Sequence, residues 1–162
     1  NCIGNHDHLG VYESSGVDPE NPRYSFKIFT DRFNLEHPYY SFDRNGCHFV
    51  MLNSIGITPE RGYTGHVDRQ QLNWLRKDLA QNAAGKPVIL VSHIPLYSAA
   101  VFFRDSSLAA NRAGLVVDNS ADILNICRPY DLKAVLQGHL HVVEEIVWKG
   151  THFITGGAVS GK

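Results

Sequence analysis

The sequence is poor in the features that mark several specialised classes of protein. No apolar run approaches the ~20 residues that cross a bilayer, which argues against insertion into a membrane. Lysine and arginine number 15 against 16 aspartates and glutamates, and the net charge of -1 offers no broad basic surface for strong binding to nucleic acid. The three cysteines, Cys2, Cys47 and Cys127, are too few and too widely spaced for a zinc knuckle or a disulfide-stapled scaffold. The class that remains is a globular domain that recognises its ligand through a local site.

The N-terminal residues include no initiator methionine and no signal peptide, because the chain begins with Asn1-Cys2 and enters a histidine motif at once. We therefore expect a fragment in which residues 1–162 form a single domain that lacks its N-terminal metal-binding segment. Since targeting information lies mostly at the N-terminus, the sequence leaves both a cytoplasmic and a periplasmic or secreted location open. It leaves the oligomeric state open as well.

Local patterns predict strands and helices in alternation, which indicates an α/β fold. Asn45-Gly46 between two β-rich runs is typical of a hairpin, and leucines at helical spacing behind a candidate N-cap, Asp68, indicate an amphipathic helix. Two short apolar runs that end at histidines indicate buried strands. The segment 9–38 is rich in turn formers and predicts a surface excursion with at most a short helix. The expected elements are a hairpin over 39–53, helices over 68–82 and 120–127, and strands over 87–92, 132–137, 142–148 and 152–155.

Three groups of histidines follow the ends of predicted strands or open the chain. They are Gly4-Asn5-His6-Asp7, Ser92-His93 and Gly138-His139-Leu140-His141. Because side chains at strand ends on one edge of an α/β sheet meet in one crevice, we expect these groups to converge. Imidazole nitrogens and an amide oxygen suit zinc, manganese or iron better than magnesium or calcium. A pair of such ions also needs aspartates, ideally one that bridges both, and we expect those aspartates upstream of residue 1.

The three groups, in this order, resemble the last three motif blocks of the calcineurin-like metallophosphoesterases, and the resemblance covers nearly the whole chain from Gly4. The Tyr-Tyr-Ser-Phe hairpin and the Trp-Leu-Arg-Lys-Asp-Leu helix look most like the branch of purple acid phosphatases and bacterial cyclic-nucleotide phosphodiesterases. The resemblance implies an αββα sandwich of two mixed β-sheets flanked by helices, incomplete at the N-terminus. It also implies a phosphatase or phosphodiesterase that acts on a small-molecule phosphoester or nucleotide.

The family pattern implies a role for each motif residue. The residues implied as metal ligands are Asn5, His93 and His139 for one ion and His141 for the other. His6 would be the histidine beside the reacting phosphate that binds no metal, and Asp7 its orienting partner. The cofactors implied for the complete protein are two divalent or trivalent ions of manganese, iron or zinc. Because the family's earlier Asp-x-His and Gly-Asp blocks have no match here, we expect the isolated chain to be inactive.

The other histidines and one aromatic loop leave alternatives open. His8, just past the first motif, fits either a packing role or a contact to substrate or to the ligands. The histidines that we interpret as structural are His37, His48, His66 and His152. The predicted loop 96–117 carries four aromatic and basic residues, which form either a wall of the substrate cleft or a hydrophobic lid packed on the domain. These four residues are Tyr97, Phe102, Phe103 and Arg104.

A non-enzymatic role is the alternative hypothesis. Some relatives with this fold serve as interaction scaffolds and bind metal weakly or not at all. Scaffold-type relatives can lose the catalytic histidine, whereas this sequence retains His6 together with every other motif residue expected in this half. The retained histidine favours the enzyme over the scaffold.

Overall fold

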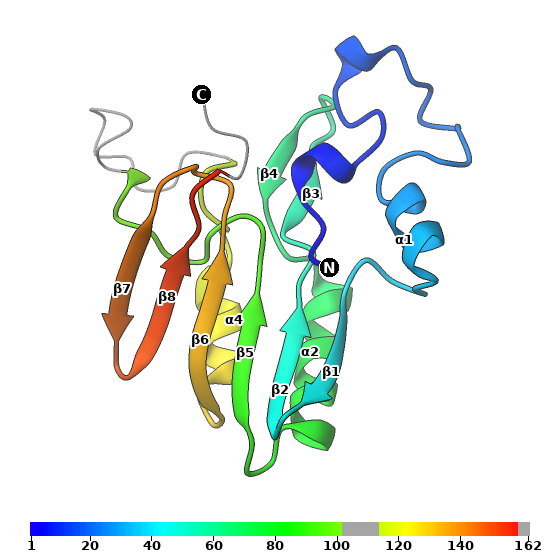
Figure 1. The fold of residues 1–162 in the computed structure, drawn as a ribbon. Helices are drawn as coiled ribbons and strands as arrows, with labels where there is room; N and C mark the ends of the chain where they lie inside the picture. The colour runs from blue at the N-terminus through cyan, green and yellow to red at the C-terminus, as the bar shows by residue number, and fades with distance from the viewer. Residues whose placement is uncertain (102–113, 159–162) are drawn as a thin grey trace.

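The computed structural model describes residues 1–101 and 114–158, and its largest feature is a six-stranded mixed β-sheet (Figure 1). In spatial order its strands are β1 (Tyr40–Arg44), β2 (Cys47–Met51), β5 (Pro87–Val91), β6 (Asp131–Gln137), β8 (Thr151–Thr155) and β7 (Glu144–Trp148). The four inner strands run parallel, and the edge strands β1 and β7 are antiparallel to their neighbours. A second, two-stranded antiparallel sheet joins β3 (Ile55–Ile57) and β4 (Tyr63–Gly65).

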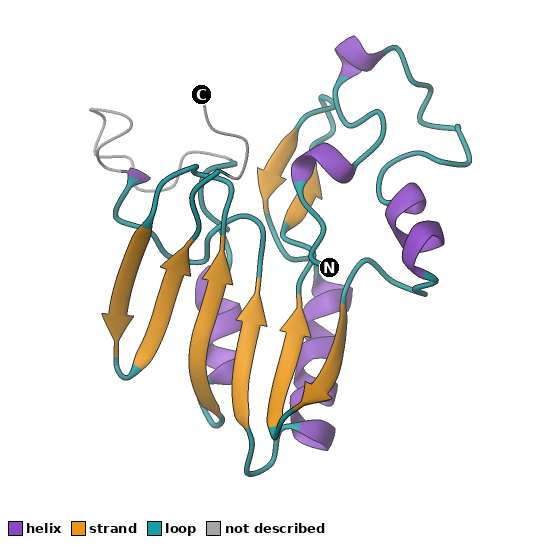
Figure 2. Ribbon diagram, in the orientation of Figure 1, coloured by secondary structure: helices purple, strands orange, loops and turns teal. Residues whose placement is uncertain are grey.

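Two helices, α2 (Arg69–Asn82) and α4 (Ser120–Cys127), cover one face of the large sheet (Figure 2). Helix α2 begins after Asp68, whose side chain accepts a hydrogen bond from the backbone N–H of Gln71 at 2.8 Å and so caps the first turn. The strands and helices bury one apolar core, and each fully buried leucine such as Leu75 contributes about 1.5 to 3 kcal/mol. Within the parts of the chain that the structure describes, none of the helices combines the length and apolar character needed to cross a bilayer.

The predicted elements are confirmed, with small shifts at their ends. Asn45 and Gly46 have φ values of 51° and 78°, the left-handed backbone that a two-residue hairpin turn requires. Strand β7 begins at Glu144, two residues later than expected. The excursion over 9–38 contains only the short helices η2 (Glu13–Ser15) and α1 (Lys27–Phe33). Strands β3 and β4 are not predicted, because runs of three residues are too short to show a strand's alternation.

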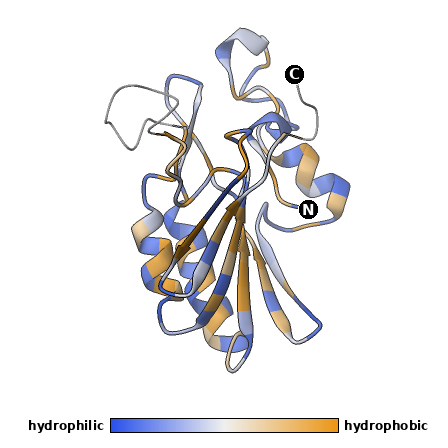
Figure 3. Ribbon diagram, turned by 60° about the vertical axis from the view of Figure 1, so that its left-hand side comes forward, coloured by the Kyte–Doolittle hydropathy of each residue, from blue (hydrophilic) through white to orange (hydrophobic). Residues whose placement is uncertain are grey.

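The face of the large sheet opposite the helices exposes apolar side chains. Leu136 on β6 is 38% exposed, Ile154 on β8 37% and Val147 on β7 57%. Because successive residues of a strand point to opposite faces, Ile154 points away from its buried neighbour Phe153. Figure 3 shows that the central strands are hydrophobic along most of their length. The α/β class, with helices outside a mixed sheet, is confirmed, and the second sheet of the described residues is a two-stranded antiparallel one.

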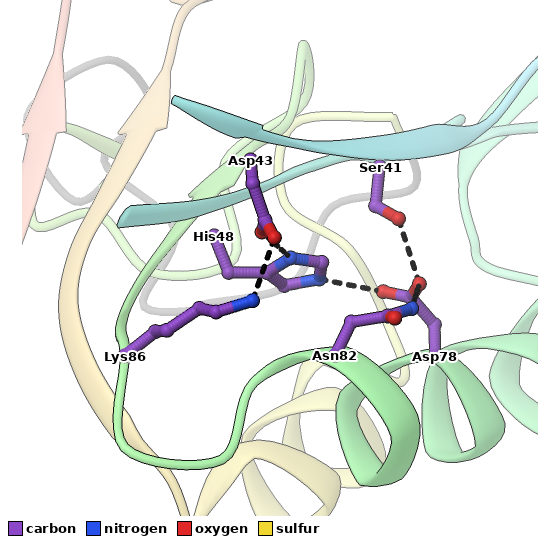
Figure 4. Close-up of polar contacts among 6 residues, drawn as sticks. All are labelled: Ser41, Asp43, His48, Asp78, Asn82 and Lys86. Atoms are coloured by element: carbon purple, nitrogen blue, oxygen red, sulfur yellow. Dashed lines mark hydrogen bonds and ion pairs between the residues drawn. The ribbon is translucent and has the colours of Figure 1, made fainter. Parts of the chain in front are cut away.

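A buried polar cluster joins the β1–β2 hairpin to α2 (Figure 4). His48 on β2 is 1% exposed, and its Nδ1 lies 2.8 Å from Asp43 Oδ1 while its Nε2 lies 2.9 Å from Asp78 Oδ2. A hydrogen bond from Lys86, followed by the one from His48, lowers the pKa of Asp43. His48 therefore links a strand to a helix, in agreement with its structural interpretation. The other three histidines of this class also contact neighbours: His37 stacks on Tyr39, His66 pairs with Asp118, and His152 pairs with Glu145.

Candidate metal centre

The candidate centre lies where strands β5 and β6 end. These strands are parallel neighbours, so their carboxyl ends lie at the same edge of the sheet. Hydrogen bonds continue past both strand ends, because Ser92 N–H donates to Leu136 O at 2.9 Å and Gly138 N–H donates to His93 O at 3.0 Å. This continued pairing sets His93 beside His139, as the sequence predicted.

The turn η1 (Asn5–Asp7) brings a third motif residue, Asn5, to the same edge from the start of the chain. Asp7 closes this turn: its Oδ2 accepts a hydrogen bond from Gly4 N–H at 2.8 Å, and its own N–H donates to Gly4 O at 3.0 Å. The carboxylate of Asp7 therefore stabilises the segment that presents both Asn5 and His6. Its role as the orienting partner of His6 stays a prediction.

Gly4 allows this turn to approach His93 closely. A Cβ atom at residue 4 would lie 2.9 Å from His93 Nδ1 and 3.0 Å from its Cε1, distances at which the imidazole ring has to move. Only glycine therefore leaves the ring of His93 in its observed place.

We expect the substitution Gly4→Ala to weaken metal binding roughly 10- to 100-fold, the range found when a residue that orients a metal ligand is changed. The measurement is a titration of the full-length protein with Mn²⁺ or Zn²⁺. The matched control is Gly156→Ala, because a Cβ atom there would lie 3.8 Å from Gln137 O, an ordinary contact. Equal metal affinities for the two variants would contradict the role given to Gly4.

Polar atoms of Asn5 and His139 both lie close to one nitrogen atom of His93, its Nε2. Asn5 Oδ1 lies 2.8 Å from His93 Nε2, and His139 Nδ1 lies 3.2 Å from the same atom. Two ligand atoms at right angles around an ion, each about 2.1 Å from it, are about 3 Å apart, so this spacing suits one shared ion. Among residues 1–101 and 114–158, no three His, Cys, Asp or Glu side chains form a group that could hold a metal. The donor set brought together here is thus two imidazoles and one amide.

The electrostatic environment favours neutral His93. Burial is the main reason that the pKa of His93 falls to about 4, and the neighbouring His139 lowers it further. The exposed residues His6 and His141 lower this pKa as well, while Asp7 opposes them. A neutral imidazole near pH 7 has a lone pair available for a metal ion.

Two of the candidate ligands have an unusual backbone conformation. His139 and His141 have φ values of 66° and 57°, in the left-handed region that few residues other than glycine adopt. Such conformations concentrate at functional sites, where the surrounding structure holds them in place. The loop after β6 therefore carries both of these side chains from left-handed backbone positions.

His8 lies beside the η1 turn but is packed in the interior. It is 5% exposed, its Nδ1 lies 3.1 Å from Ser25 Oγ, and the adjacent Leu9 forms a backbone bridge with Ser25. Burial lowers the pKa of His8 to about 4. These contacts favour the packing role for His8 over a contact to substrate.

The segment after His93 is held from the end of β6. Gln137 Oε1 accepts a hydrogen bond from Leu96 N–H at 3.0 Å, and Gln137 Nε2 donates to Tyr97 O at 2.6 Å. The ring of Tyr97 packs edge-on against buried Phe153, with 5.8 Å between ring centroids. The position of Tyr97 thus favours packing on the domain over a wall of the substrate cleft. The other residues of this predicted loop feature, Phe102, Phe103 and Arg104, lie outside the residues that the structure describes.

Tyr63 borders the centre, and Tyr12 packs on its outer side. The hydroxyl of Tyr63 on β4 lies 3.5 Å from His139 Nε2, and the two rings are edge to face at 5.8 Å. Tyr12 packs edge to face against Tyr63 at 5.9 Å. No sequence pattern marks either residue, because Tyr12 precedes a turn and Tyr63 begins a three-residue strand.

Two cavities of the structure lie along helix α4. One has a volume of about 380 Å³ and is lined by residues near the start of β6, among them Arg128, Lys133 and Lys149. The other, of about 340 Å³, is lined mostly by apolar residues and shares Trp148 and Phe153 with the first. Neither is lined by Asn5, His93 or His139, so the donor atoms and not these cavities locate the centre.

Several known proteins are similar to this chain. Purple acid phosphatase 21 of Arabidopsis thaliana is 38% identical over 90 residues, which cover 49% of this chain and 19% of that protein. A probable cyclic nucleotide phosphodiesterase of Rhodococcus erythropolis is 27% identical over 146 residues, which cover 86% of this chain and 38% of that protein. Among solved structures, GAP50, the anchor in the inner membrane complex of Plasmodium, has a TM-score of 0.48 and 16% identity over 76% of this chain and 38% of that chain.

The chain therefore spans less than two fifths of the length of each of these proteins. The family model of the calcineurin-like phosphoesterases matches residues 2–143. That match includes all three histidine groups, from Asn5 to His141. The chain belongs to the calcineurin-like phosphoesterase family.

Proposed function

We propose that the full-length protein hydrolyses phosphate esters at a dinuclear metal centre. This chain contributes four ligands to it: Asn5, His93 and His139 for one ion and His141 for the other. The main support is the approach of Asn5 Oδ1 and His139 Nδ1 to within 2.8 and 3.2 Å of His93 Nε2. The family to which the chain belongs supports the reaction class. When bound, two metal ions supply the Lewis acidity that activates water and offsets charge on the phosphoryl oxygens.

The proposed ions are manganese, iron or zinc in the divalent or trivalent state. Two imidazoles and an amide suit such borderline ions, whereas magnesium and calcium prefer oxygen ligands throughout. A dinuclear centre also needs carboxylates, and none joins the cluster within the described ranges. We therefore assign the remaining ligands to aspartates of a segment outside this chain.

His6 acts on the substrate and not on the metal in this proposal. Its side chain is exposed, whereas Asn5 beside it is buried and directed to His93. An exposed imidazole at this edge can protonate the leaving oxygen or stabilise charge on the phosphate, a role worth about 10²- to 10⁴-fold in rate. Asp7 positions His6 through the turn that its carboxylate closes.

The proposed substrates are small-molecule phosphoesters or nucleotides. The relatives named above include a phosphatase and a probable phosphodiesterase, which supports either a monoester or a diester. The net charge of -1 gives no broad basic surface that would favour a nucleic acid polymer.

The test compares this chain with the full-length protein in metal content and in hydrolysis of p-nitrophenyl phosphate and bis-p-nitrophenyl phosphate. We expect the full-length protein to bind about two ions and to hydrolyse at least one of the esters, and the isolated chain to be inactive. If the full-length protein folds but binds no metal and hydrolyses neither ester, the enzyme hypothesis is wrong and the interaction-scaffold hypothesis takes its place.

A further inference from the structure

An aromatic row leads from the metal centre to the solvent. It starts at His139, continues to Tyr63 with 5.8 Å between ring centroids, and ends at Tyr12 after a further 5.9 Å. Both contacts are edge to face, with interplanar angles of 86° and 80°. Tyr63 is half-buried and packs on the main core, whereas Tyr12 is 43% exposed. The row therefore has a fixed inner member and an outer member that a ligand can reach.

The segment that carries Tyr12 is anchored on the same hairpin that carries Tyr63. Arg61, in the turn between β3 and β4, donates hydrogen bonds from Nη2 to Gly10 O at 2.8 Å and to Val17 O at 2.6 Å. These two carbonyls flank Tyr12 on either side. Although it belongs to a long excursion, Tyr12 is thus held at a defined distance from the centre, and binding a ligand there costs little ordering of the loop.

We propose that Tyr12 and Tyr63 form the contact surface for the organic group of the substrate and select esters in which that group is a planar aromatic ring. The inference rests on the proposed function, because it takes the phosphate to lie at the centre next to His139. The proposal requires that a ring attached to that phosphate lie against Tyr63 or Tyr12, where aromatic contacts are favourable. A short aliphatic group presents no ring to either tyrosine. Aryl phosphates and nucleotides both meet this requirement.

The experiment uses the full-length, metal-loaded protein with phenyl phosphate and glycerol phosphate as substrates. We expect Tyr12→Ala to raise KM for phenyl phosphate roughly 3- to 10-fold with kcat little changed, and to leave both constants for glycerol phosphate unchanged. Tyr12→Phe keeps the ring and should behave as the unsubstituted protein. The matched control is Tyr97→Ala, since Tyr97 is 52% exposed but packs against Phe153.

A binding measurement separates ring recognition from turnover. Calorimetry with phenylphosphonate and methylphosphonate should show that Tyr12→Ala weakens the binding of phenylphosphonate only. The dissociation constant should rise by the same factor as KM for phenyl phosphate. Equal effects on both phosphonates, or no effect on either, would overturn the selection for a ring while leaving the phosphoesterase in place. If the unsubstituted protein hydrolyses neither p-nitrophenyl phosphate nor bis-p-nitrophenyl phosphate, the proposed function fails and this inference fails with it.

Discussion

Replacing His6 by alanine in the full-length protein is expected to lower kcat about 10²- to 10⁴-fold while the metal content stays the same. The reason is that Asn5 and His6, neighbours in one turn, have different roles in the proposed site. Asn5 is buried and its Oδ1 lies 2.8 Å from His93 Nε2, whereas His6 is exposed and, in the proposed function, acts on the substrate. The measurement pairs kcat for p-nitrophenyl phosphate with metal analysis of the purified variant.

Two further variants define what the His6→Ala result means. His93→Ala should lose metal and turnover together, because His93 Nε2 is the atom on which the cluster converges. His37→Ala should change neither, since His37 stacks on Tyr39 and belongs to none of the three histidine groups. If His6→Ala loses metal to the same extent as His93→Ala, then His6 is a ligand and its proposed role is wrong.

Asp78→Ala is expected to cost about 1 to 3 kcal/mol in the free energy of unfolding of the full-length protein, the range for leaving a buried hydrogen-bonding group without its partner. Asp78 is 6% exposed and accepts three hydrogen bonds (Figure 4). The donors are His48 Nε2 at 2.9 Å, Ser41 Oγ at 2.7 Å and Asn82 Nδ2 at 2.9 Å. Removing the carboxylate leaves the buried His48 Nε2 without its acceptor, whereas water can replace the acceptor at half-buried Ser41 and exposed Asn82, so the loss at His48 is the destabilising one.

Urea unfolding of the single variants Asp78→Ala and His48→Ala, and of the double variant, provides the measurement. The two residues touch, so the cost of the double variant should fall well short of the sum of the single costs. Asp131→Ala is the surface control, because its ion pair with Lys133 is more than half exposed on both sides and should contribute at most about 1 kcal/mol. A loss of that small size for Asp78→Ala would show that the cluster does not hold the hairpin to the helix.

The secondary structure was predictable wherever one local pattern extended over several residues. The 39–53 hairpin follows from Asn45-Gly46, and the leucine spacing behind Asp68 gives α2. The order of the strands was not predictable in the same way. The sheet places β8 next to β6, with β7 at the edge, although β7 comes first in the chain. Which strands become neighbours depends on the faces that they bury in the folded protein. A local sequence pattern does not contain this information.

The residues that supply the donor atoms of the candidate site were predictable from the sequence, whereas the contacts that hold these residues in place were not. The three histidine groups identified Asn5, His93 and His139, and the structure brings these three together. The bond between Asp7 and Gly4, in contrast, depends on the shape of the turn. The position of Gln137 beneath the segment after His93 depends on two strands and a loop that lie far apart in the sequence. Supporting contacts of this kind arise from tertiary packing and leave no motif.

The sheet order has a consequence for how the centre responds to fluctuations of the protein. Strands β5 and β6, which lead into His93 and His139, have a paired strand on each side, whereas β1 and β7 lie at the edges. Local unfolding starts where backbone hydrogen bonds meet solvent, and the innermost strands open last. Amide hydrogens of Leu90 and Val135 should therefore exchange among the slowest in the protein, since both residues are fully buried on these strands. The edges of the sheet can open and close many times while His93 and His139, the two candidate ligands, keep their spacing.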